Sequence, residues 1–249
     1  MADFDNRIWA GAASGAGTID TGLRAYMLKV YNYMAGALAL TGVVAYGVVQ
    51  TGLINLFYHA TMTTNGVALQ PTILGWVVML APLAMVFFLS FRIMHMSLPA
   101  AQATFWLYAG LVGASLSSIL LVYTGASIAL TFFVTAATFG AMSLWGYTTK
   151  RDLTGMGNFL MMGLIGILIA MLANMFFHSA AIEFVVSILG VLIFTGLTAW
   201  DTQKIKNTYY QVSHDGTLAG KMAVMGALSL YLDFLNIFLF LLRFLGDRR

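Results

Sequence analysis

The sequence predicts an all-α membrane protein, folded as a bundle of seven transmembrane helices. Hydrophobic residues make up 60% of the 249-residue chain and charged residues only 8%, whereas soluble domains carry about 25% charged residues. Twelve lysines and arginines with nine aspartates and glutamates cannot cover the surface of a soluble globule of this length. Seven apolar stretches are each long enough to cross a bilayer. The missing polar surface is therefore expected to face lipid.

Each stretch reaches the roughly 20 apolar residues that a helix needs to cross a hydrocarbon core about 30 Å thick. The stretches are 30–49, 72–91, 101–123, 127–147, 159–177, 182–200 and 222–245. Residues 1–24 contain no apolar core of a signal peptide and predict a flexible cytoplasmic arm rich in Gly and Ala. Residues 25–249 then form a single transmembrane domain, whose first helix is expected to serve as the uncleaved insertion signal.

The second to fifth helices carry packing signals. Pro82 lies inside the second helix and is expected to kink it. The next three helices each contain two small residues four positions apart, a spacing that lets backbones approach closely in lipid. These pairs are Gly110 with Ala114, Ala136 with Gly140, and Gly166 with Ala170. They predict a tightly packed bundle and no particular function.

Lys and Arg placement predicts a cytoplasmic N-terminus. Basic residues occur before the first helix and after the second, fourth and sixth helices, while the other three loops contain none, as the positive-inside rule requires. The C-terminal Arg243, Arg248 and Arg249 conflict with this pattern, because seven full crossings place them on the outer side. A re-entrant last segment would return them to the cytoplasm. We favour seven crossings.

Composition excludes several classes of function. The net charge is +3, but the basic residues are scattered at helix ends and form no patch for nucleic acid. The chain has no cysteine, which excludes disulfides, thiolate metal sites and a cysteine nucleophile. None of its four histidines lies in an HxxxH or HExxH pattern, so we expect no metal-dependent enzyme and no resident cofactor.

Three acidic residues remain at membrane depth or at its edge: Glu183, Asp201 and Asp233. Glu183 opens the sixth helix, where a carboxylate is favourable at a helix N-terminus. Asp201 ends the predicted sixth helix, and Asp233 lies well inside the seventh among apolar residues. An isolated charge there costs roughly 2.5–3.5 kcal/mol on insertion scales. A proton, a partner or water must offset that cost.

Consecutive helices are usually neighbours, so Asp201 and Asp233 are candidates for a pair. They meet only if the seventh helix begins below the membrane surface. Two carboxyl groups in contact would share a proton, giving a pH sensor without histidine and a weak, oxygen-rich site for Ca²⁺. Arg92 ends the second helix on the same side and either pairs with Asp201 or anchors in headgroups. Two asparagines, Asn174 and Asn236, are candidates for hydrogen bonds between helices.

The last two helices resemble the Bax inhibitor-1 family of membrane proteins. The resemblance rests on GLTAWDTQKIK around Asp201 and GALSLYLDFLNIFLFLLRFLG around Asp233, and the stretch from Thr131 to Ile167 is similar to the bacterial branch. It implies a central seventh helix, a bacterial inner-membrane location and a pH-sensitive Ca²⁺ leak. It also implies that Asp201 and Asp233 form the sensor and that Arg92 latches the closed state by pairing with Asp201.

The main hypothesis is therefore a pH-gated Ca²⁺ leak whose partners are the lipid bilayer, Ca²⁺ and protons. Two alternatives stay open at this point. A regulatory protein could bind and restrain a membrane protease or another channel. An intramembrane aspartyl protease also places one aspartate on each of two adjacent helices, but the chain lacks the GxGD and PAL motifs of presenilin-like enzymes.

Overall fold

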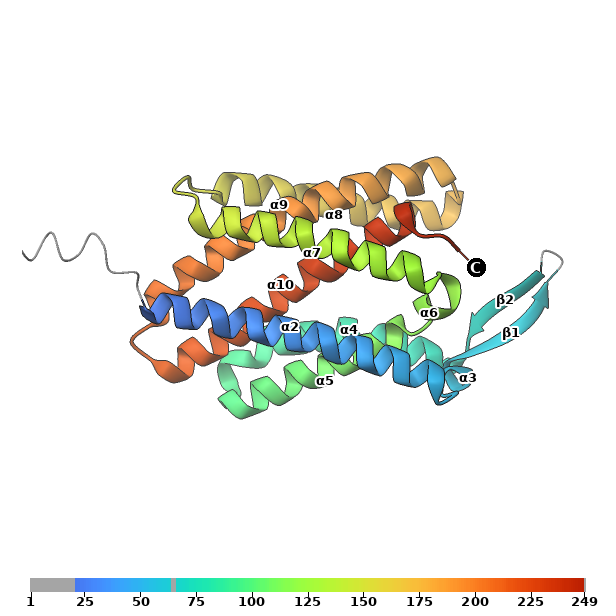
Figure 1. The fold of residues 1–249 in the computed structure, drawn as a ribbon, viewed down its shortest axis with the longest axis horizontal. Helices are drawn as coiled ribbons and strands as arrows, with labels where there is room; N and C mark the ends of the chain where they lie inside the picture. Colours follow the sequence, from blue (N-terminus) through green and yellow to red (C-terminus); the bar gives the residue numbers. More distant parts are fainter. Residues whose placement is uncertain (1–20, 64–65, 249) are drawn as a thin grey trace, which may run out of the picture.

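The structure is a computed structural model that describes residues 21–63 and 66–248. Seven helices in this part of the chain are long and apolar enough to cross a membrane, which confirms the predicted fold class. They are α2 (Thr21–Gln50), α4 (Ile73–Arg92), α5 (Leu98–Leu116), α7 (Gly125–Thr148), α8 (Thr154–Phe177), α9 (Ala180–Val212) and α10 (Gly216–Leu245). Figure 1 shows them running along the long axis of the molecule.

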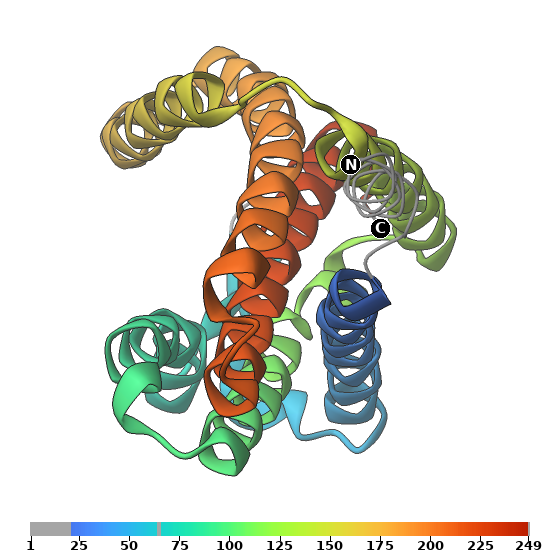
Figure 2. The same cartoon turned by 90° about the vertical axis from the view of Figure 1, so that its left-hand side faces the viewer.

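Helix α10 is the centre of the bundle, as expected from the resemblance. In its most apolar stretch 67% of the residues are buried, against at most 33% in any other span of the described chain. The other helices lie around α9 and α10 when the molecule is seen along its length (Figure 2). Small residues on α10, among them Gly220, Ala223 and Ala227, are buried and leave room for neighbours on all sides. Side chains of the remaining spans are free to face lipid.

Several helix ends differ from the prediction. Helix α2 begins at Thr21, so residues 21–24 of the predicted arm are helical; residues 1–20 lie outside the described part. Helix α9 continues past residue 200 to Val212, and α10 begins six positions before the predicted 222, at Gly216. An apolar stretch of sequence marks only the part of a helix that lies inside the hydrocarbon. The polar turns that extend beyond the hydrocarbon are not marked by such a stretch.

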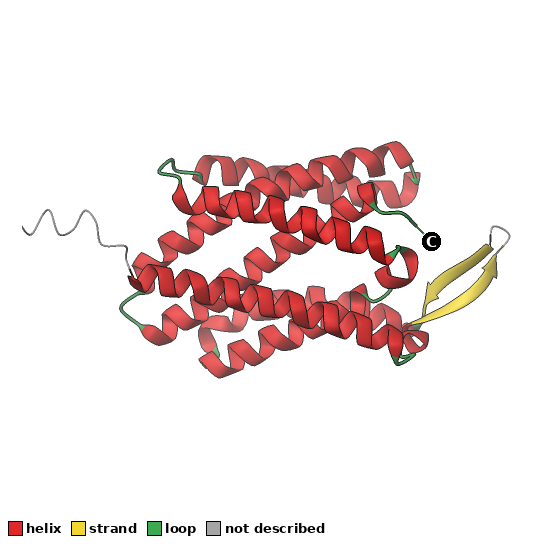
Figure 3. Cartoon of the chain, in the orientation of Figure 1, coloured by secondary structure: helices red, strands yellow, loops and turns green. Residues whose placement is uncertain are grey.

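The connections contain elements that apolar windows do not detect. A β-hairpin of β1 (Tyr58–Thr63) and β2 (Gly66–Pro71) follows the short helix α3 (Ile54–Phe57) and projects from one end of the bundle (Figure 3). Helix α4 ends in a 3₁₀ turn, η1 (Ile93–His95). The third span is interrupted after α5 and finishes as α6 (Ile119–Val122). These short elements shape the ends of the bundle without adding a crossing.

The C-terminal tail lies at the end of the bundle opposite to the start of α2 (Figure 1). It is held there because the Thr124 amide donates to the Asp247 carbonyl at 3.1 Å and the Asp247 amide donates to Ser127 Oγ at 2.9 Å. Residues Tyr123 and Arg248 also form a β-bridge. The last helix is therefore a full crossing, and the re-entrant alternative is wrong. Which end faces the cytoplasm stays a prediction.

The closest helix contacts are not at the predicted small-residue pairs. A Cβ atom placed on Gly110, Gly140 or Gly166 meets no neighbouring atom within 4 Å. By contrast, a Cβ on Gly146 of α7 would overlap the Ala199 carbonyl of α9, and one on Gly157 of α8 would overlap the Trp200 ring. Tight packing is thus found around the α9 segment that precedes Asp201 and also at other helix contacts, such as Gly113 of α5, where a Cβ atom would overlap the Thr41 carbonyl of α2.

Candidate functional site: a buried pair of carboxyl groups

Asp201 and Asp233 come together at the contact between α9 and α10. Their carboxyl groups lie within hydrogen-bonding distance of each other. Asp201 lies about three turns before the end of α9, and Asp233 about five turns after the start of α10. The two meet because both helices extend beyond the apolar stretches, which places the turn between them outside the membrane. Helix α10 thus begins early enough for the two aspartates to meet, as the sequence-based prediction required.

The two carboxyl groups have different surroundings. Asp233 is 4% exposed, and its Oδ2 atom has no hydrogen-bond partner among the described residues. Asp201 is half-buried, and the positive charge of Lys204 acts on it from one turn further along α9. The Lys204 ammonium itself lies 4.9 Å from the centre of the Trp200 ring. Asp201 therefore connects the buried carboxyl of Asp233 to the polar end of the bundle.

A chain of hydroxyl groups fixes the α9 residue next to Asp201. Thr202 Oγ1 lies 2.9 Å from Ser143 Oγ of α7, and Ser143 Oγ lies 2.6 Å from the Tyr31 hydroxyl of α2. Thr202 and Ser143 are buried. In a site that water does not reach freely, each of these hydrogen bonds restricts how α9 rotates. The chain therefore holds Asp201 facing α10.

The next residue, Gln203, fixes the loop between α7 and α8. Its Oε1 atom accepts a hydrogen bond from the Leu153 amide at 2.8 Å, and its Nε2 atom donates to the Arg151 carbonyl at 2.8 Å. One turn further on, Lys206 donates to the Tyr147 carbonyl at 2.8 Å. These contacts were not predicted from the sequence. The run of polar residues DTQKIK directly after an apolar helix was the available signal for them.

We expect Gln203→Leu to destabilise the protein by about 1–3 kcal/mol, the cost of leaving buried polar groups without a partner. The substitution removes both hydrogen bonds to the α7–α8 loop, and the Leu153 amide that loses its acceptor is buried. Thermal unfolding in detergent measures the effect. The control is Gln211→Leu, because Gln211 is exposed on the same helix. Equal melting temperatures for the two variants would contradict the role of Gln203.

Aromatic and hydroxyl contacts fix the α10 side of the pair. The Tyr231 hydroxyl lies 2.7 Å from Thr41 Oγ1 of α2, which donates to the Ala109 carbonyl of α5 at 3.0 Å. Phe234, next to Asp233, packs against Phe139 of α7 with ring centres 5.7 Å apart. The Tyr231 ring also packs against Tyr108 of α5 with ring centres 5.7 Å apart, so residues near Asp233 contact three different helices. Its carboxyl group is held in a fixed position in the bundle.

The other predicted site residues lie apart from the pair. Arg92 is exposed at the end of α4, and no ion pair joins it to Asp201 in the described chain; the latch stays a prediction. Asn236 donates within its own helix to the Leu232 carbonyl, and Asn174 accepts from the Ser179 amide beside the start of α9. Glu183 is exposed in the first turn of α9. The two asparagines form no hydrogen bond between transmembrane helices in the part described.

Asp152, in the loop held by Gln203, differs from the buried pair. It is exposed, and it accepts hydrogen bonds from the Thr154 hydroxyl at 2.7 Å and the Thr154 amide at 2.9 Å. These hydrogen bonds lower the pKa of Asp152 below its usual value, because they favour the charged form. Asp152 is therefore ionised at neutral pH and accepts hydrogen bonds from the first residue of α8.

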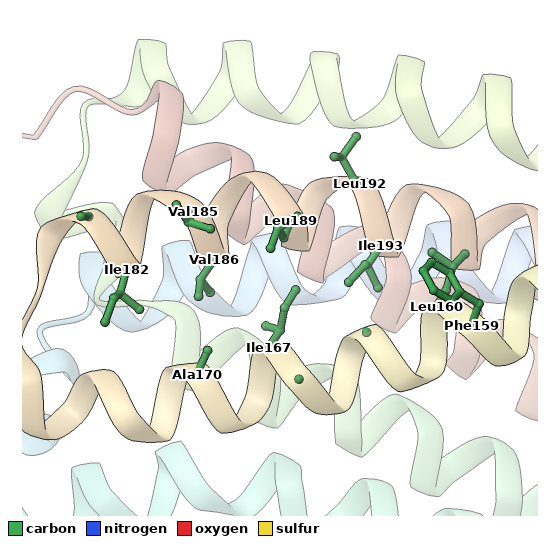
Figure 4. A pocket seen from close by; sticks show the side chains of 13 residues that line it. Phe159, Leu160, Ile167, Ala170, Ile182, Val185, Val186, Leu189, Leu192 and Ile193 are labelled. Atoms are coloured by element: carbon green, nitrogen blue, oxygen red, sulfur yellow. The ribbon is translucent and has the colours of Figure 1, made fainter.

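A hollow of about 700 Å³ lies between α8 and α9 and is lined by none of the predicted site residues. Figure 4 shows its walls, which are made of apolar side chains such as Leu160, Ile167 and Ile193. None of its lining residues is titratable. Leu189 and Leu192 at its edge are exposed on a face that the fold turns toward lipid. Acyl chains are the natural occupants of such a surface.

No group of three or more histidine, aspartate or glutamate side chains gathers to hold a metal ion in the described residues. The Asp201–Asp233 pair supplies the oxygen atoms of only two carboxyl groups, whereas Ca²⁺ prefers six to eight oxygen ligands. The pair therefore suits transient contact with a cation better than a permanent metal site.

The fold and the site define a class: a seven-helix membrane protein with a carboxyl pair buried between its last two helices. The family profile described as inhibitor of apoptosis-promoting Bax1 matches residues 23–249. The chain therefore belongs to the Bax inhibitor-1 family, as the resemblance in its last two helices indicated.

Curated bacterial proteins match the chain over almost its whole length. An uncharacterized protein of Rickettsia prowazekii is 52% identical over 234 residues, which cover 93% of each chain. The inner membrane protein YbhL of Escherichia coli is 48% identical and covers 92% of this chain and 94% of its own. An uncharacterized membrane protein of Streptococcus pyogenes is 35% identical and covers 91% and 94%.

Proposed function

We propose that the protein is a pH-sensitive leak for Ca²⁺ in the bacterial inner membrane, gated by the Asp201–Asp233 pair. The main supporting observation is that Asp233, at 4% exposure, contacts a second carboxyl group, while its Oδ2 atom has no hydrogen-bond partner among the described residues. The inner-membrane location is supported by the name of the Escherichia coli relative. The proposal involves no chemical reaction and no resident cofactor.

The pH response follows from electrostatics. Two carboxylates in contact and away from water repel each other strongly, so a shared proton stabilises the closed contact between α9 and α10. When the pair loses that proton, repulsion pushes the two helices apart. Both aspartates lie within helices that are fixed by neighbours on either side of the pair, so the displacement is transmitted to the surrounding bundle.

Of the two arrangements considered for the closed state, the shared proton has the better support. Asp201 interacts with Asp233 and Lys204, whereas Arg92 is exposed without an ion pair to Asp201 in the described chain. Arg92 then acts as a headgroup anchor in this conformation. The pairing of Arg92 with Asp201 stays a prediction for another conformation.

Buried hydroxyl groups support a path for cations beyond the pair. Every fourth residue of α7 from Ser127 to Ser143 is buried, and all of them except Phe139 carry a hydroxyl. The buried side of α7 faces α9 and α10, the helices with which it has extensive contacts. Thr131 Oγ1 is buried without a hydrogen-bond partner among the described residues. Such a group is costly in a membrane interior, so water or a passing cation is its expected partner.

A flux assay tests the proposal. The wild-type protein in liposomes is expected to admit Ca²⁺ at a rate that changes with pH, and Asp201→Asn is expected to remove most of that change. Protein-free liposomes supply the background. Wild-type flux equal to that background, or an unchanged pH response in Asp201→Asn, would overturn the proposal.

Thr131→Val is expected to lower Ca²⁺ flux about fivefold, equivalent to ~1 kcal/mol, without lowering the melting temperature. Valine keeps the shape of threonine and removes a hydroxyl that forms no hydrogen bond in the described structure. The matched control is Thr148→Val at the end of the same helix, where Thr148 is exposed and donates to the Leu144 carbonyl at 2.8 Å. Equal flux in the two variants would exclude the buried hydroxyl groups of α7 as the path for Ca²⁺.

A further inference from the structure

Two adjoining hollows lie at the end of the bundle opposite to the start of α2. Their volumes are about 310 and 280 Å³, and Glu183, Arg243 and Arg248 line both. Glu183 belongs to the first turn of α9, Arg243 to the last turn of α10 and Arg248 to the C-terminal tail. The hollows therefore sit where helices leave the hydrocarbon, at the depth of lipid headgroups.

The three charged side chains converge on the hollows without neutralising each other. Glu183 forms no ion pair within 4 Å with either arginine in the described structure, and all three side chains are exposed. Two guanidinium groups and one carboxylate match a ligand that carries a phosphate and a separate ammonium group. A guanidinium binds phosphate oxygens through paired hydrogen bonds. A carboxylate accepts hydrogen bonds from a primary ammonium group.

The position of Arg248 is fixed by the backbone of the tail. Residues Tyr123 and Arg248 form a β-bridge, and the Asp247 carbonyl accepts a hydrogen bond from the Thr124 amide at 3.1 Å. The Asp247 amide donates to Ser127 Oγ at 2.9 Å. The tail therefore holds Arg248 at the hollows, and the site combines residues that are far apart in the sequence.

An apolar surface continues from the charged groups. Phe184 and Phe244 line one of the hollows, and their ring centres lie 5.7 Å apart. They are 53% and 52% exposed, respectively, on the surface that faces lipid. Aromatic side chains are common at the membrane–water interface. This pair supplies a surface for the first part of an acyl chain below a headgroup held by the arginines.

We propose that these hollows bind a phospholipid with a phosphoethanolamine headgroup. Arg243 and Arg248 hold its phosphate, and Glu183 accepts hydrogen bonds from its ammonium group. A bound phosphate also gives the C-terminal arginines a partner at the end where the positive-inside pattern does not expect them. This inference is independent of Ca²⁺ flux and of the aspartate pair.

Native mass spectrometry of the full-length protein in detergent tests the inference. The protein is mixed in turn with phosphatidylethanolamine, phosphatidylglycerol and phosphatidylcholine of the same acyl chains, and the retained lipid is counted. The wild type is expected to retain phosphatidylethanolamine best. Arg243→Gln and Arg248→Gln are each expected to reduce its retention about tenfold, equivalent to ~1.4 kcal/mol.

Glu183→Gln separates a zwitterionic ligand from a simple anion. It is expected to weaken retention of phosphatidylethanolamine and to leave that of phosphatidylglycerol unchanged, because only the former carries an ammonium group. Lys150→Gln is the control, because Lys150 is exposed in the loop between α7 and α8, away from the hollows. Unchanged retention in both arginine variants, better retention of phosphatidylglycerol by the wild type, or displacement of lipid by inorganic phosphate would overturn the inference.

Discussion

Replacing Asp233 by asparagine is expected to abolish the pH dependence of Ca²⁺ flux and to reduce the flux about tenfold, equivalent to ~1.4 kcal/mol of lost cation stabilisation. The physical reason is that an amide cannot release a proton or carry a negative charge. Asp233 is the more buried member of the pair, and its Oδ2 atom lacks a partner in the described structure. Flux in liposomes over a range of pH measures both quantities.

The double variant sharpens this prediction. If the two carboxyl groups act as one unit, Asp201→Asn together with Asp233→Asn has little more effect on the pH response than either change alone. Asp215→Asn is a matched control on the same helix, because Asp215 caps the start of α10 through its Oδ1 atom and asparagine caps equally well. Additive losses in the double variant would show that the two aspartates act separately.

Gly146→Ala is expected to destabilise the bundle by about 3 kcal/mol, at the upper end of the cost of overpacking. The added Cβ would overlap the Ala199 carbonyl of α9. Because the clashing atom belongs to the backbone, no rotation of a side chain relieves it. Helix α9 must move away from α7, which strains the nearby hydrogen bond between Ser143 and Thr202. Thermal unfolding in detergent measures the loss.

Gly140→Ala is the control for this substitution. Gly140 lies on the same helix, and a Cβ atom there meets no neighbour within 4 Å. Its melting temperature is therefore expected to stay the same or rise slightly, since alanine favours a helix more than glycine does. A loss of stability as large as that of Gly146→Ala would mean that the close approach of α7 to α9 is not the cause.

Much of the fold can be predicted from the sequence because the bilayer imposes a length on each apolar helix. The number of spans and the full crossing by the last helix follow from that constraint. The extension of α9 to Val212 does not follow from the bilayer thickness, because the segment DTQKIKNTYYQV is polar and the apolar stretch of the helix ends before it. The β-hairpin after α3 was missed for the same reason.

The acid pair could be predicted because carboxyl groups inside apolar helices are costly and conspicuous. The residues that position it could not. Gln203 and Thr202 were visible only as polar residues, and their partners Leu153 and Ser143 are far away in the sequence. Gly146 was missed because a glycine at a helix contact differs from a glycine facing lipid only in its neighbours. Those neighbours are a property of the packed structure.

The most direct test of the central claim is to observe the proton on the pair. Infrared difference spectroscopy detects the carbonyl stretch of a protonated carboxyl group. In the wild type this band is expected to titrate over the same pH interval as the Ca²⁺ flux, and Asp201→Asn and Asp233→Asn are each expected to move the titration of the remaining carboxyl group out of that interval. A band that keeps the same titration in both variants, or a flux that changes with pH while no carboxyl band changes, would contradict the account.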